Sequence, residues 1–381
     1  MKVLTVIGAR PQFIKAAAVS RITKNRDGLD EVIVHTGQHY DNNMSSVFFD
    51  QLEIPKPRYN LEVAGLSHGA MTGKMLEGIE RTIKKEAPDW VLVYGDTNST
   101  LAATLASVKC HVPVAHVEAG LRSHNPLMPE EINRVLTDRC SSVLFCPTDT
   151  ASRNLRIEGF PFAATVPTDK ATPMDGERMS AAVGLQSVLN VGDVMYDAVS
   201  FCRSHAINAF DLQSIGAEAG QYAICTIHRQ ENTDSKRNLQ EIFAALVEIS
   251  REVPVFIPVH PRTRRRLEDN GIKETLGLRF MEPLPYFELQ SLLARAAFVL
   301  TDSGGLQKEA FFHHVPCITL REETEWAETV DSGWNSLAGA DKPKILQQVQ
   351  ELAQRKPLKD VNYYGDGKAS EKIVDTLVRL S

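Results

Sequence analysis

The feature that most constrains the fold of this 381-residue chain is a series of short apolar runs, each followed by a stretch of helical character. The runs are "KVLTVIG", "EVIVHTG", "WVLVYGD", "PVAHVEAG" and "SVLFCPT", then "YAICTIHRQEN", "VFIPVHPRT", "LRFMEPL", "FVLTDSGG" and "PCITLRE". Apolar runs that alternate with helices are typical of parallel sheets covered by helices on both faces. The chain is therefore predicted to be α/β, with doubly wound parallel sheets.

The runs fall into two groups, which predict two Rossmann-like domains, residues 1–190 and 191–381. Between the groups, residues 159–184 are rich in Pro, Thr, Ala and Gly, a composition typical of a loop or linker. A last helical pattern, about residues 367–381, either finishes the second domain or packs on the first. The length of the chain and its 43% hydrophobic residues suffice for two cores.

Composition excludes several classes of protein. The net charge of −6 and the scattered basic residues argue against a nucleic-acid partner. No stretch approaches the roughly 18 apolar residues of a membrane span, and Arg10, Gln12 and Lys15 interrupt the only run that imitates a signal peptide. The six cysteines form no CxxC pair, which favours reduced core residues over disulfides or zinc ligands. A cytoplasmic protein is expected.

Polar residues follow the apolar runs at the predicted carboxyl ends of the strands, where open α/β sheets bind their ligands. One such residue alone would be an ordinary turn residue, but their number in both domains predicts a ligand held in a cleft between two facing sets of strand ends. These residues are Arg10, His35, Gln38, His39, Asp96, Glu118, His228, Arg229, His260, residues 302–305 and Arg321.

The run "VLTDSGGLQKEA", residues 299–310, indicates a nucleotide site. A strand that breaks at Ser303, Gly304 and Gly305 before a helix leaves backbone N–H groups free for a phosphate. Glu309 follows on the same helix, about 9 Å beyond Ser303 at 1.5 Å per residue. That distance lets its carboxylate accept hydrogen bonds from ribose hydroxyls while the phosphates lie at the helix start. The pattern predicts a ribonucleoside diphosphate.

Basic residues support an anionic ligand. In "GARPQFIKAA", Arg10 and Lys15 lie near a helix start, where positive charge is unfavourable unless an anion binds; the alternative is that both extend into solvent. The segment lacks GxGxxG, so a dinucleotide fingerprint is not supported. In "TIHRQEN", His228 and Arg229 suit a diphosphate, and "PVHPRT" repeats the pattern with His260. No closely spaced set of metal ligands is visible, and no metal or cofactor is predicted.

Carboxylates gather in the first domain. Asp96 follows a strand in "VYGDTNSTLAA", where an isolated Asp is often only an N-cap. In "HVEAGLRSHNPLMPEEINR", Glu118 ends a strand, and Glu130 and Glu131 begin the next helix. A glutamate in the first turn is ordinary helix-dipole chemistry for one of this pair. Three carboxylates at one sheet edge are nevertheless what proton transfer on both faces of a sugar requires.

Together the motifs resemble the non-hydrolysing UDP-N-acetylglucosamine 2-epimerase family. The resemblance covers nearly the whole chain through "GARPQFIKAA", "VYGDTNSTLA", "HVEAGLRS", "PEEINR", "CTIHRQEN", "PVHP" and "LTDSGGLQKEA", in the order of the family. It implies two Rossmann-like domains arranged as in a GT-B glycosyltransferase, an active site in the cleft, UDP and a UDP-sugar as ligands, a homodimer, and a place in the synthesis of surface-polysaccharide precursors.

The resemblance also implies roles for individual residues. Asp96, Glu118 and Glu130 match the catalytic carboxylates, and His228 matches a histidine near the leaving diphosphate. Arg10 and Lys15 match residues that face the diphosphate and sugar. Ser303, Gly304 and Gly305 match the phosphate loop, Glu309 the ribose ligand and Tyr286 an aromatic position beside the uracil, and Arg229 and His260 are further substrate-binding candidates.

The implied chemistry is an elimination. The C2 proton of an N-acetylglucosamine unit is not next to a carbonyl, so its simple removal and return is difficult. One carboxylate takes this proton as UDP leaves C1, which gives a 2-acetamidoglucal. Another group then protonates C2 from the opposite face, and UDP adds back. Cationic side chains and the helix start stabilise the charge that grows on the diphosphate.

The sequence departs from the commoner family pattern. The family's "GTRPEAIK" is "GARPQFIK" here, and its "TTERPE" is "ETEWAE" around Trp326. Both variants resemble the subgroup that acts on UDP-2,3-diacetamido-2,3-dideoxyglucuronic acid, which leaves two substrates open. In "GQHYDNN", Tyr40 and Asp41 replace residues of members with an allosteric UDP-sugar site, which argues against activation by substrate.

Two further functions have the same nucleotide loop. A GT-B glycosyltransferase needs an acceptor in addition, and a UDP-sugar sensor does not need three carboxylates. Incubation with the UDP-sugar in D₂O discriminates among them, because only an epimerase incorporates deuterium at C2.

Overall fold

A computed structural model of the chain describes residues 1–38, 51–52, 54–161, 186–259, 261–352 and 362–381. Packing divides the chain into two units, the first Met1–Ala198 with Asn362–Ser381 and the second Val199–Val361. The division therefore falls eight residues beyond the predicted boundary at residue 190. The last helix belongs to the first unit because it packs against the first helix of the chain.

The first unit contains a seven-stranded sheet in which every strand pairing is parallel. The order across the sheet is β3-β2-β1-β4-β5-β6-β7. Along the chain the strands are β1 (Lys2–Ile7), β2 (Asp30–His35), β3 (Tyr59–Asn60), β4 (Trp90–Tyr94), β5 (Val114–Val117), β6 (Val143–Cys146) and β7 (Ser187–Asn190).

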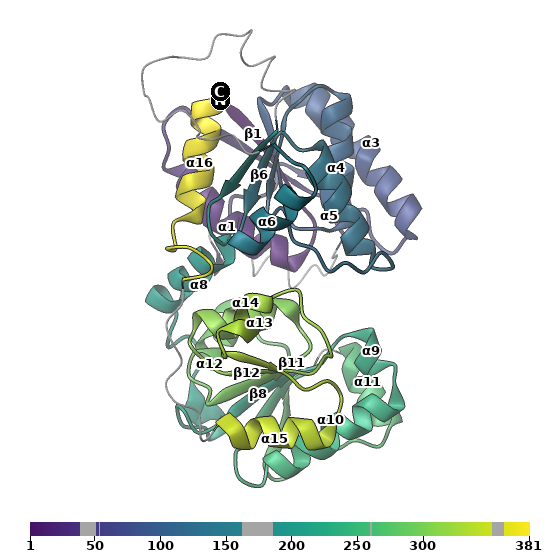
Figure 1. Ribbon diagram of the computed structural model, residues 1–381, viewed down its shortest axis with the longest axis vertical. Helices are drawn as coiled ribbons and strands as arrows, with labels where there is room; N and C mark the ends of the chain where they lie inside the picture. Colours follow the sequence, from purple (N-terminus) through teal and green to yellow (C-terminus); the bar gives the residue numbers. More distant parts are fainter. Residues whose placement is uncertain (39–50, 53, 162–185, 260, 353–361) are drawn as a thin grey trace. The chain divides into compact units, whose positions relative to one another are not determined.

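Helices cover both faces of this sheet (Figure 1). Among the described residues, the helices that lie wholly in the first unit are α1 (Arg10–Lys24), α3 (His68–Glu86), α4 (Asn98–Lys109), α5 (Pro129–Cys140), α6 (Asp149–Ile157) and α16 (Ala369–Leu380). On one face α3 packs on α4 and α4 on α5, and on the other α16 lies beside α1. The chain ends meet there, where the Ser381 hydroxyl lies 2.6 Å from the Met1 sulfur. Helix α8 (Val194–His205) continues from the first unit into the second.

The second unit contains a six-stranded parallel sheet in the order β10-β9-β8-β11-β12-β13. Its strands are β8 (Ala223–Thr226), β9 (Val255–Pro258), β10 (Leu278–Met281), β11 (Phe298–Thr301), β12 (Cys317–Thr319) and β13 (Asn335–Leu337). Its helices are the 3₁₀ turn η1 (Leu212–Ile215), α9 (Gln230–Thr233), α10 (Lys236–Ile249), α11 (Pro261–Asp269), α12 (Tyr286–Leu293), α13 (Gly304–Phe312), α14 (Ala327–Asp331) and α15 (Lys342–Leu352).

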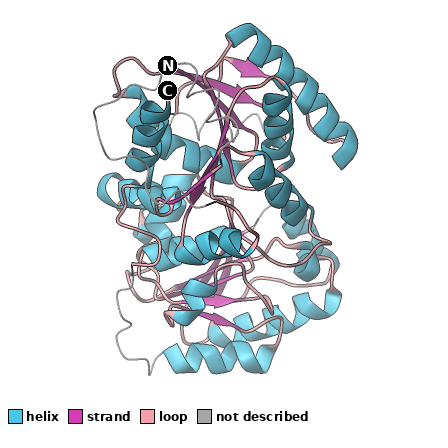
Figure 2. Cartoon of the chain, turned by 45° about the horizontal axis from the view of Figure 1, so that its top comes forward, coloured by secondary structure: helices cyan, strands magenta, loops and turns pink. Residues whose placement is uncertain are grey.

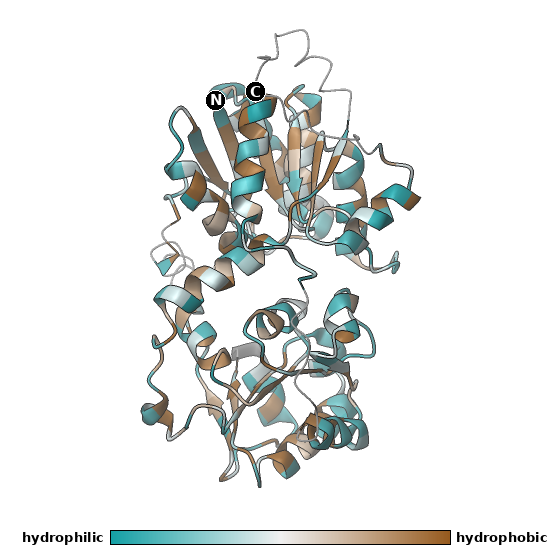
Figure 3. Ribbon diagram, turned by 60° about the vertical axis from the view of Figure 1, so that its left-hand side comes forward, coloured by the Kyte–Doolittle hydropathy of each residue, from teal (hydrophilic) through white to brown (hydrophobic). Residues whose placement is uncertain are grey.

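In each unit the helices flank the sheet, and the hydrophobic core lies between the sheet and these helices (Figure 2). In the second unit, one cluster joins the strands to α10 and α15, and another joins them to α12 and α13. All residues of β4 are buried, and the strands are largely hydrophobic while the helices carry polar outer faces (Figure 3). This burial on two faces explains the continuous apolar runs and confirms the prediction of doubly wound parallel sheets.

Each sheet has a point at which the strand order reverses, between β1 and β4 in the first and between β8 and β11 in the second. Doubly wound sheets bind ligands at such switch points, outside the carboxyl ends of the strands. The four strands lead into "GARPQ", "GDTNS", "HRQEN" and "DSGGL". The topology therefore brings the predicted motifs of each unit to its switch point.

Candidate functional site

The carboxyl ends of β4 and β5 carry two of the predicted catalytic residues. Tyr94 and Val117 are register partners in the sheet, so the turns that follow them lie side by side. Asp96 lies in the first turn and Glu118 in the second. Gly95 has φ +60° and Glu118 has φ +74°, a left-handed conformation that is uncommon for a residue with a side chain. Such strained backbone tends to occur at functional sites.

The carboxylate of Glu118 forms an ion pair with the ammonium group of Lys15, and both side chains are buried. Lys15 comes from α1, and its ammonium group faces this carboxylate in the structure. Its contact with an anionic ligand stays a prediction. A Cβ atom on Gly95 would lie 3.2 Å from Glu118 Oε2 and 3.5 Å from Lys15 Nζ. Because Gly95 has no side chain, the ion pair between Lys15 and Glu118 fits beside it.

The charges of Lys15 and Glu118 also act on Asp96. Its carboxylate accepts a hydrogen bond from Arg134 of α5, with Nη2 at 2.5 Å from Oδ2. Burial raises the pKa of Asp96 above its usual value, Arg134 opposes this rise, and the charges of Glu118 and Glu130 add to it. The structure thus brings the three predicted carboxylates together around one strand-end turn.

The two glutamates that begin α5 differ in their surroundings. Glu131 is buried, and its carboxylate accepts hydrogen bonds from the backbone N–H groups of Ser123 and His124, at 2.9 and 3.1 Å, and from the Ser123 hydroxyl. Glu131 therefore holds the loop that follows β5. Glu130 is half-buried and remains the candidate for chemistry at this helix start.

The turn after β8 presents His228 and Arg229 in the second unit. The buried carboxylate of Asp302 accepts hydrogen bonds from the backbone N–H groups of both residues, at 3.0–3.1 Å, and from the Asn232 amide. Asp302 is thus a support of this turn. The His228 side chain is 51% exposed, and its Nδ1 lies 3.3 Å from Asp302 Oδ1, so its ring is accessible to a ligand.

Helix α13 begins at the predicted phosphate loop. Ser303 is the N-cap, and its hydroxyl accepts a hydrogen bond from the Leu306 N–H at 3.4 Å. Gly304 is buried against Glu325 and Trp326, and a Cβ atom there would clash with the Glu325 carboxylate. Gly305 is exposed, and a Cβ atom there would meet only the Ser303 hydroxyl, at 3.9 Å. The backbone at Gly305 is therefore open to a ligand.

Glu309, the predicted ribose ligand, is 6% exposed. Burial raises its pKa to about 7, and hydrogen bonds from Gln290 and Tyr286 together with the charge of Lys308 partly oppose this rise. Tyr286 is itself buried at the start of α12. In this structure its side chain therefore interacts with Glu309, and its contact with uracil stays a prediction.

Several residues of the site had no predicted role. Arg134 was visible only as the last residue of "PEEINR", four positions after Glu130 and so on the same side of a helix. Lys308, 1% exposed, places its ammonium group 3.7 Å from the centre of the Trp326 ring. Sequence spacing gave no signal for this cation–π contact. His116 and Asp138 form a buried pair behind the carboxylates.

Some predictions fall on residues outside the described ranges. His260, His39, Tyr40 and Asp41 are among them, as is most of the segment 159–184. All six cysteines are described, none forms a disulfide, and four are buried. Within the described residues there is no cluster of three potential metal ligands, and none of the helices there is long and apolar enough to cross a membrane.

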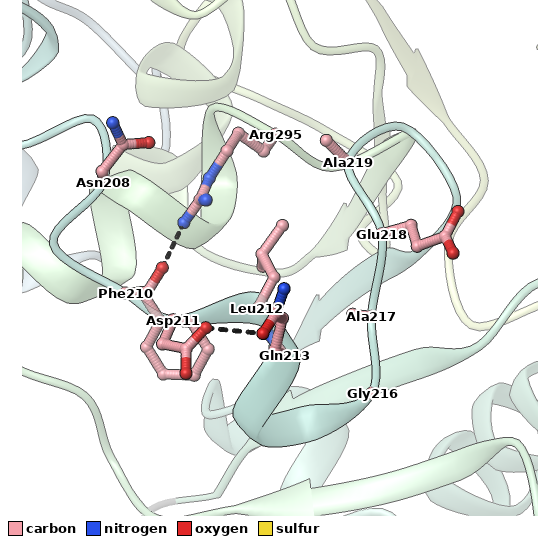
Figure 4. A pocket seen from close by; sticks show the side chains of 10 residues that line it. All are labelled: Asn208, Phe210, Asp211, Leu212, Gln213, Gly216, Ala217, Glu218, Ala219 and Arg295. Atoms are coloured by element: carbon pink, nitrogen blue, oxygen red, sulfur yellow. Dashed lines mark hydrogen bonds between the residues drawn. The ribbon is translucent and has the colours of Figure 1, made fainter.

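A surface pocket of the second unit, of about 740 Å³, lies at a different place (Figure 4). Its lining comes from the segment before β8 and from Arg295 before β11, so it lies at the amino ends of these strands. The Arg295 guanidinium is engaged by the Phe210 carbonyl at 2.6 Å. The pocket is therefore separate from the switch-point residues. It is lined by Asn208, Phe210, Asp211, Leu212, Gln213, Gly216, Ala217, Glu218, Ala219 and Arg295.

Two doubly wound units, with clustered carboxylates at one switch point and a glycine-containing helix start at the other, define a GT-B-like α/β protein. The family model for UDP-N-acetylglucosamine 2-epimerase matches residues 21–378. The chain therefore belongs to the UDP-N-acetylglucosamine 2-epimerase family and is an enzyme of the isomerase class. Membership favours this class over the glycosyltransferase and the sensor.

Individual relatives are similar over their whole length. The UDP-2,3-diacetamido-2,3-dideoxy-D-glucuronate 2-epimerase of Pseudomonas aeruginosa is 49% identical over 381 residues, with all of both chains covered. A UDP-N-acetylglucosamine 2-epimerase homolog of Methanococcus maripaludis is 46% identical over 388 residues, also with full coverage. The crystal structure of Methanocaldococcus jannaschii UDP-GlcNAc 2-epimerase in complex with UDP-GlcNAc and UDP has a TM-score of 0.84 at 38% identity and covers 99% of each chain.

Proposed function

We propose that this enzyme inverts C2 of a UDP-2-acetamido sugar by eliminating UDP to a 2-acetamidoglucal and adding it back. The observation that carries the proposal is the cluster of Asp96, Glu118 and Glu130 at the switch point of the first unit. Proton removal on one face of C2 and proton return on the other need two groups with different protonation states. The cluster offers such a pair.

The surroundings of the carboxylates suggest their roles. Glu118 is paired with Lys15, which favours its ionised form, so we assign it as the base that takes the C2 proton. Burial raises the pKa of Asp96, which favours a bound proton, so we assign it as the group that protonates the intermediate. In the reverse direction the two roles exchange. Glu130 acts on the ionisation of Asp96 through its charge.

The second unit supplies the nucleotide contacts in this proposal. The N–H groups at Gly304 and Gly305 and the hydroxyl of Ser303 receive the diphosphate, and Glu309 receives the ribose hydroxyls. The exposed ring of His228 protonates or stabilises the leaving phosphate. The remaining predicted contacts, Arg10, Arg229, His260 and Tyr286, stay proposals of the same kind. The jannaschii enzyme, crystallised with UDP-GlcNAc and UDP, supports both ligands for this chain.

Two substrates are consistent with this chemistry. UDP-N-acetylglucosamine follows from the family as a whole. The diacetamido glucuronate is favoured by the 49% identical relative from Pseudomonas aeruginosa and by the variants "GARPQFIK" and "ETEWAE". Rates with both UDP-sugars, measured side by side, decide between them, because the true substrate has the higher kcat/KM.

Deuterium incorporation tests the reaction itself. The enzyme is incubated in D₂O with each UDP-sugar, and NMR follows deuterium at C2 and the epimeric product. We expect exchange with one of the sugars, its loss in Glu118→Gln, and largely unchanged UDP binding in that variant. Glu77→Gln, on the exposed surface of α3, is the matched control. No exchange with either sugar would refute the proposal, and exchange that survives in Glu118→Gln would refute the assigned base.

A homodimer, implied by the family resemblance, is also a proposal. Leu127, Ile132 and Leu136 are 89%, 49% and 44% exposed on α5 and the loop before it, and such an apolar group suits a symmetric interface. Analytical ultracentrifugation of the wild-type enzyme and of Ile132→Glu/Leu136→Glu tests it. We expect a dimer that dissociates in the variant, and a wild-type monomer would overturn the proposal. A cytoplasmic location stays a prediction.

A further inference from the structure

A fully buried histidine lies directly behind the candidate catalytic turn of the first unit. His116, on β5, is 0% exposed. Its Nδ1 lies 2.7 Å from Asp138 Oδ1, and its Nε2 lies 2.7 Å from the carbonyl oxygen of Gly95. Asp138, on α5, is also 0% exposed. The imidazole ring therefore connects α5 to the residue that precedes Asp96.

Both ring nitrogens face acceptors. The Gly95 carbonyl oxygen can only accept. The Asp138 carboxylate uses its other oxygen to accept from the Gly120 N–H at 3.2 Å and from Arg122 Nη1 at 2.7 Å. Oδ2 therefore accepts from two donors, and Oδ1 faces the imidazole ring. A neutral imidazole has one donor and one acceptor, whereas an imidazolium has two donors. A ring that donates from both nitrogens would satisfy the contacts to Asp138 and to Gly95.

The same pair supports both catalytic turns. Through His116, Asp138 fixes the carbonyl of Gly95, next to Asp96. Through the Gly120 N–H it fixes the turn that begins at Glu118, whose φ of +74° needs support from its surroundings. Arg122 completes the arrangement, because its guanidinium also pairs with Glu158, with Nε at 2.6 Å from Oε1. Buried charges of both signs therefore balance each other.

We propose that His116 and Asp138 are positioning residues of the reaction, and that His116, as an imidazolium with two donors, sets the distance between the carboxylates of Asp96 and Glu118. The inference rests on the proposed function, since it concerns the same carboxylates. Neither residue transfers a proton to the substrate. Their effect is geometric, and displacement of a reacting group by about 1 Å can cost on the order of 100-fold in rate.

The first experiment compares His116→Phe, which keeps a ring of similar size, with wild type and with His205→Phe on the exposed surface of α8. We expect kcat for deuterium exchange at C2, measured per folded protein, to fall on the order of 100-fold in His116→Phe, while UDP affinity changes little. The melting temperature should fall as well, because the Asp138 carboxylate and the Gly95 carbonyl lose a buried partner. A wild-type kcat in this variant would overturn the inference. A fall in activity that disappears when kcat is referred to the folded protein would also do so, because it would show a structural role only.

Substitutions of Asp138 separate hydrogen bonding from packing. In Asp138→Asn the amide oxygen can still accept from Gly120 and Arg122, and the amide N–H can donate to a neutral His116. Asp138→Leu removes all of these contacts. We therefore expect Asp138→Asn to keep at least about ten times the kcat of Asp138→Leu. Equal kcat values in the two variants would contradict the inference.

Ring-¹⁵N NMR of histidine-labelled enzyme reads the protonation state directly, with the His116 signals assigned by their absence in His116→Phe or, if that variant does not fold, in His116→Gln. We expect two protonated ring nitrogens in wild type and one in Asp138→Asn. A neutral ring in wild type would overturn the inference. Absence of exchange in the wild-type enzyme would instead refute the proposed function, so the two failures are distinguishable.

Discussion

The carboxylate of Glu325 occupies the space into which a side chain on Gly304 would extend. Gly304 begins α13, and Glu325 belongs to the segment "ETEWAE" that follows β12. Arg321 holds Glu325 from the other side, with Nη1 at 3.1 Å from Oε2. The two glycines of "DSGGL" therefore differ. Gly304 has no room for a side chain because Glu325 lies against it, whereas Gly305 faces open space.

Alanine substitutions should separate these reasons. Gly304→Ala forces the Glu325 carboxylate away and should lower the free energy of unfolding by about 1–3 kcal/mol, as overpacking does. Gly305→Ala should leave stability unchanged or raise it by about 0.4–1 kcal/mol, yet weaken UDP binding at least about tenfold if the diphosphate approaches this backbone. Urea denaturation and calorimetric titration with UDP measure the two effects. Equal behaviour of the variants would contradict the distinction.

The ionisation of Glu309 should affect stability and binding in opposite ways. Burial raises its pKa from 4.5 to about 7, so the folded state binds the proton more tightly than the unfolded state. This contribution to stability is complete below pH 4.5 and is lost as the pH rises through 7. Glu309→Gln removes this loss, so relative to wild type it should gain on the order of 2 kcal/mol between pH 5 and pH 8. Denaturation at both pH values measures it.

The substitution that stabilises the protein at pH 8 should weaken its binding of UDP. The ionised carboxylate is the better acceptor for ribose hydroxyls, so Glu309→Gln and Glu309→Ala should weaken UDP binding on the order of tenfold or more at pH 8. The Glu309-dependent part of the affinity should be smaller at pH 6, where the carboxyl group carries a proton. If Glu309→Ala leaves the affinity for UDP unchanged, Glu309 does not bind the ribose and its role is purely structural.

Removal of the Arg134 charge should change the titration of Asp96. Arg134 opposes the rise in the pKa of Asp96, so Arg134→Gln should raise that pKa further. The limb of the kcat profile that belongs to Asp96 should then move to higher pH. The profile is measured from pH 5 to 10 in wild type, Arg134→Gln and Arg134→Lys, and the lysine variant should retain part of the effect. A limb that stays in place would assign it to another group.

The contact between Lys308 and Trp326 should contribute measurable coupling. The ammonium group lies 3.7 Å from the ring centre and is buried, which is the favourable case for a cation–π interaction. A double-mutant cycle with Lys308→Met and Trp326→Leu should give a coupling of about 1–2 kcal/mol in urea denaturation followed by circular dichroism. Additive effects of the two substitutions would show that the contact contributes little.

The sequence indicated the α/β class because strands buried on both faces must be apolar throughout. Ten of the strands that the structure describes were visible in this way. The remaining three, β3, β7 and β13, are two to four residues long and contain polar residues such as Asn60, Ser187 and Asn335. Runs so short and mixed do not stand out from loops. Their place depends on pairing with neighbouring strands, which is a tertiary effect.

The return of the C-terminal helix to the first unit could not be decided from its amphipathic pattern. Helix α16 has a buried face that includes Ile373 and Leu377, and any sheet-covering surface would suit it. Contacts with α1 place α16 on the first unit, as do hydrogen bonds from the backbone of Ala369 and Ser370 to Asp197. These contacts join residues more than 170 positions apart, which local patterns do not record.

By itself, the sequence determined the order of the motifs and the types of groups available: carboxylates after the strands of the first unit and a glycine-containing helix start in the second. The tertiary structure decided which of these groups meet. Strand order places Gly95 beside Glu118, and α5 brings Arg134 to Asp96 and Asp138 to His116. The physical reason is that the ionisation of a carboxylate depends on burial and on charges within a few ångströms, and sheet register and helix packing set both.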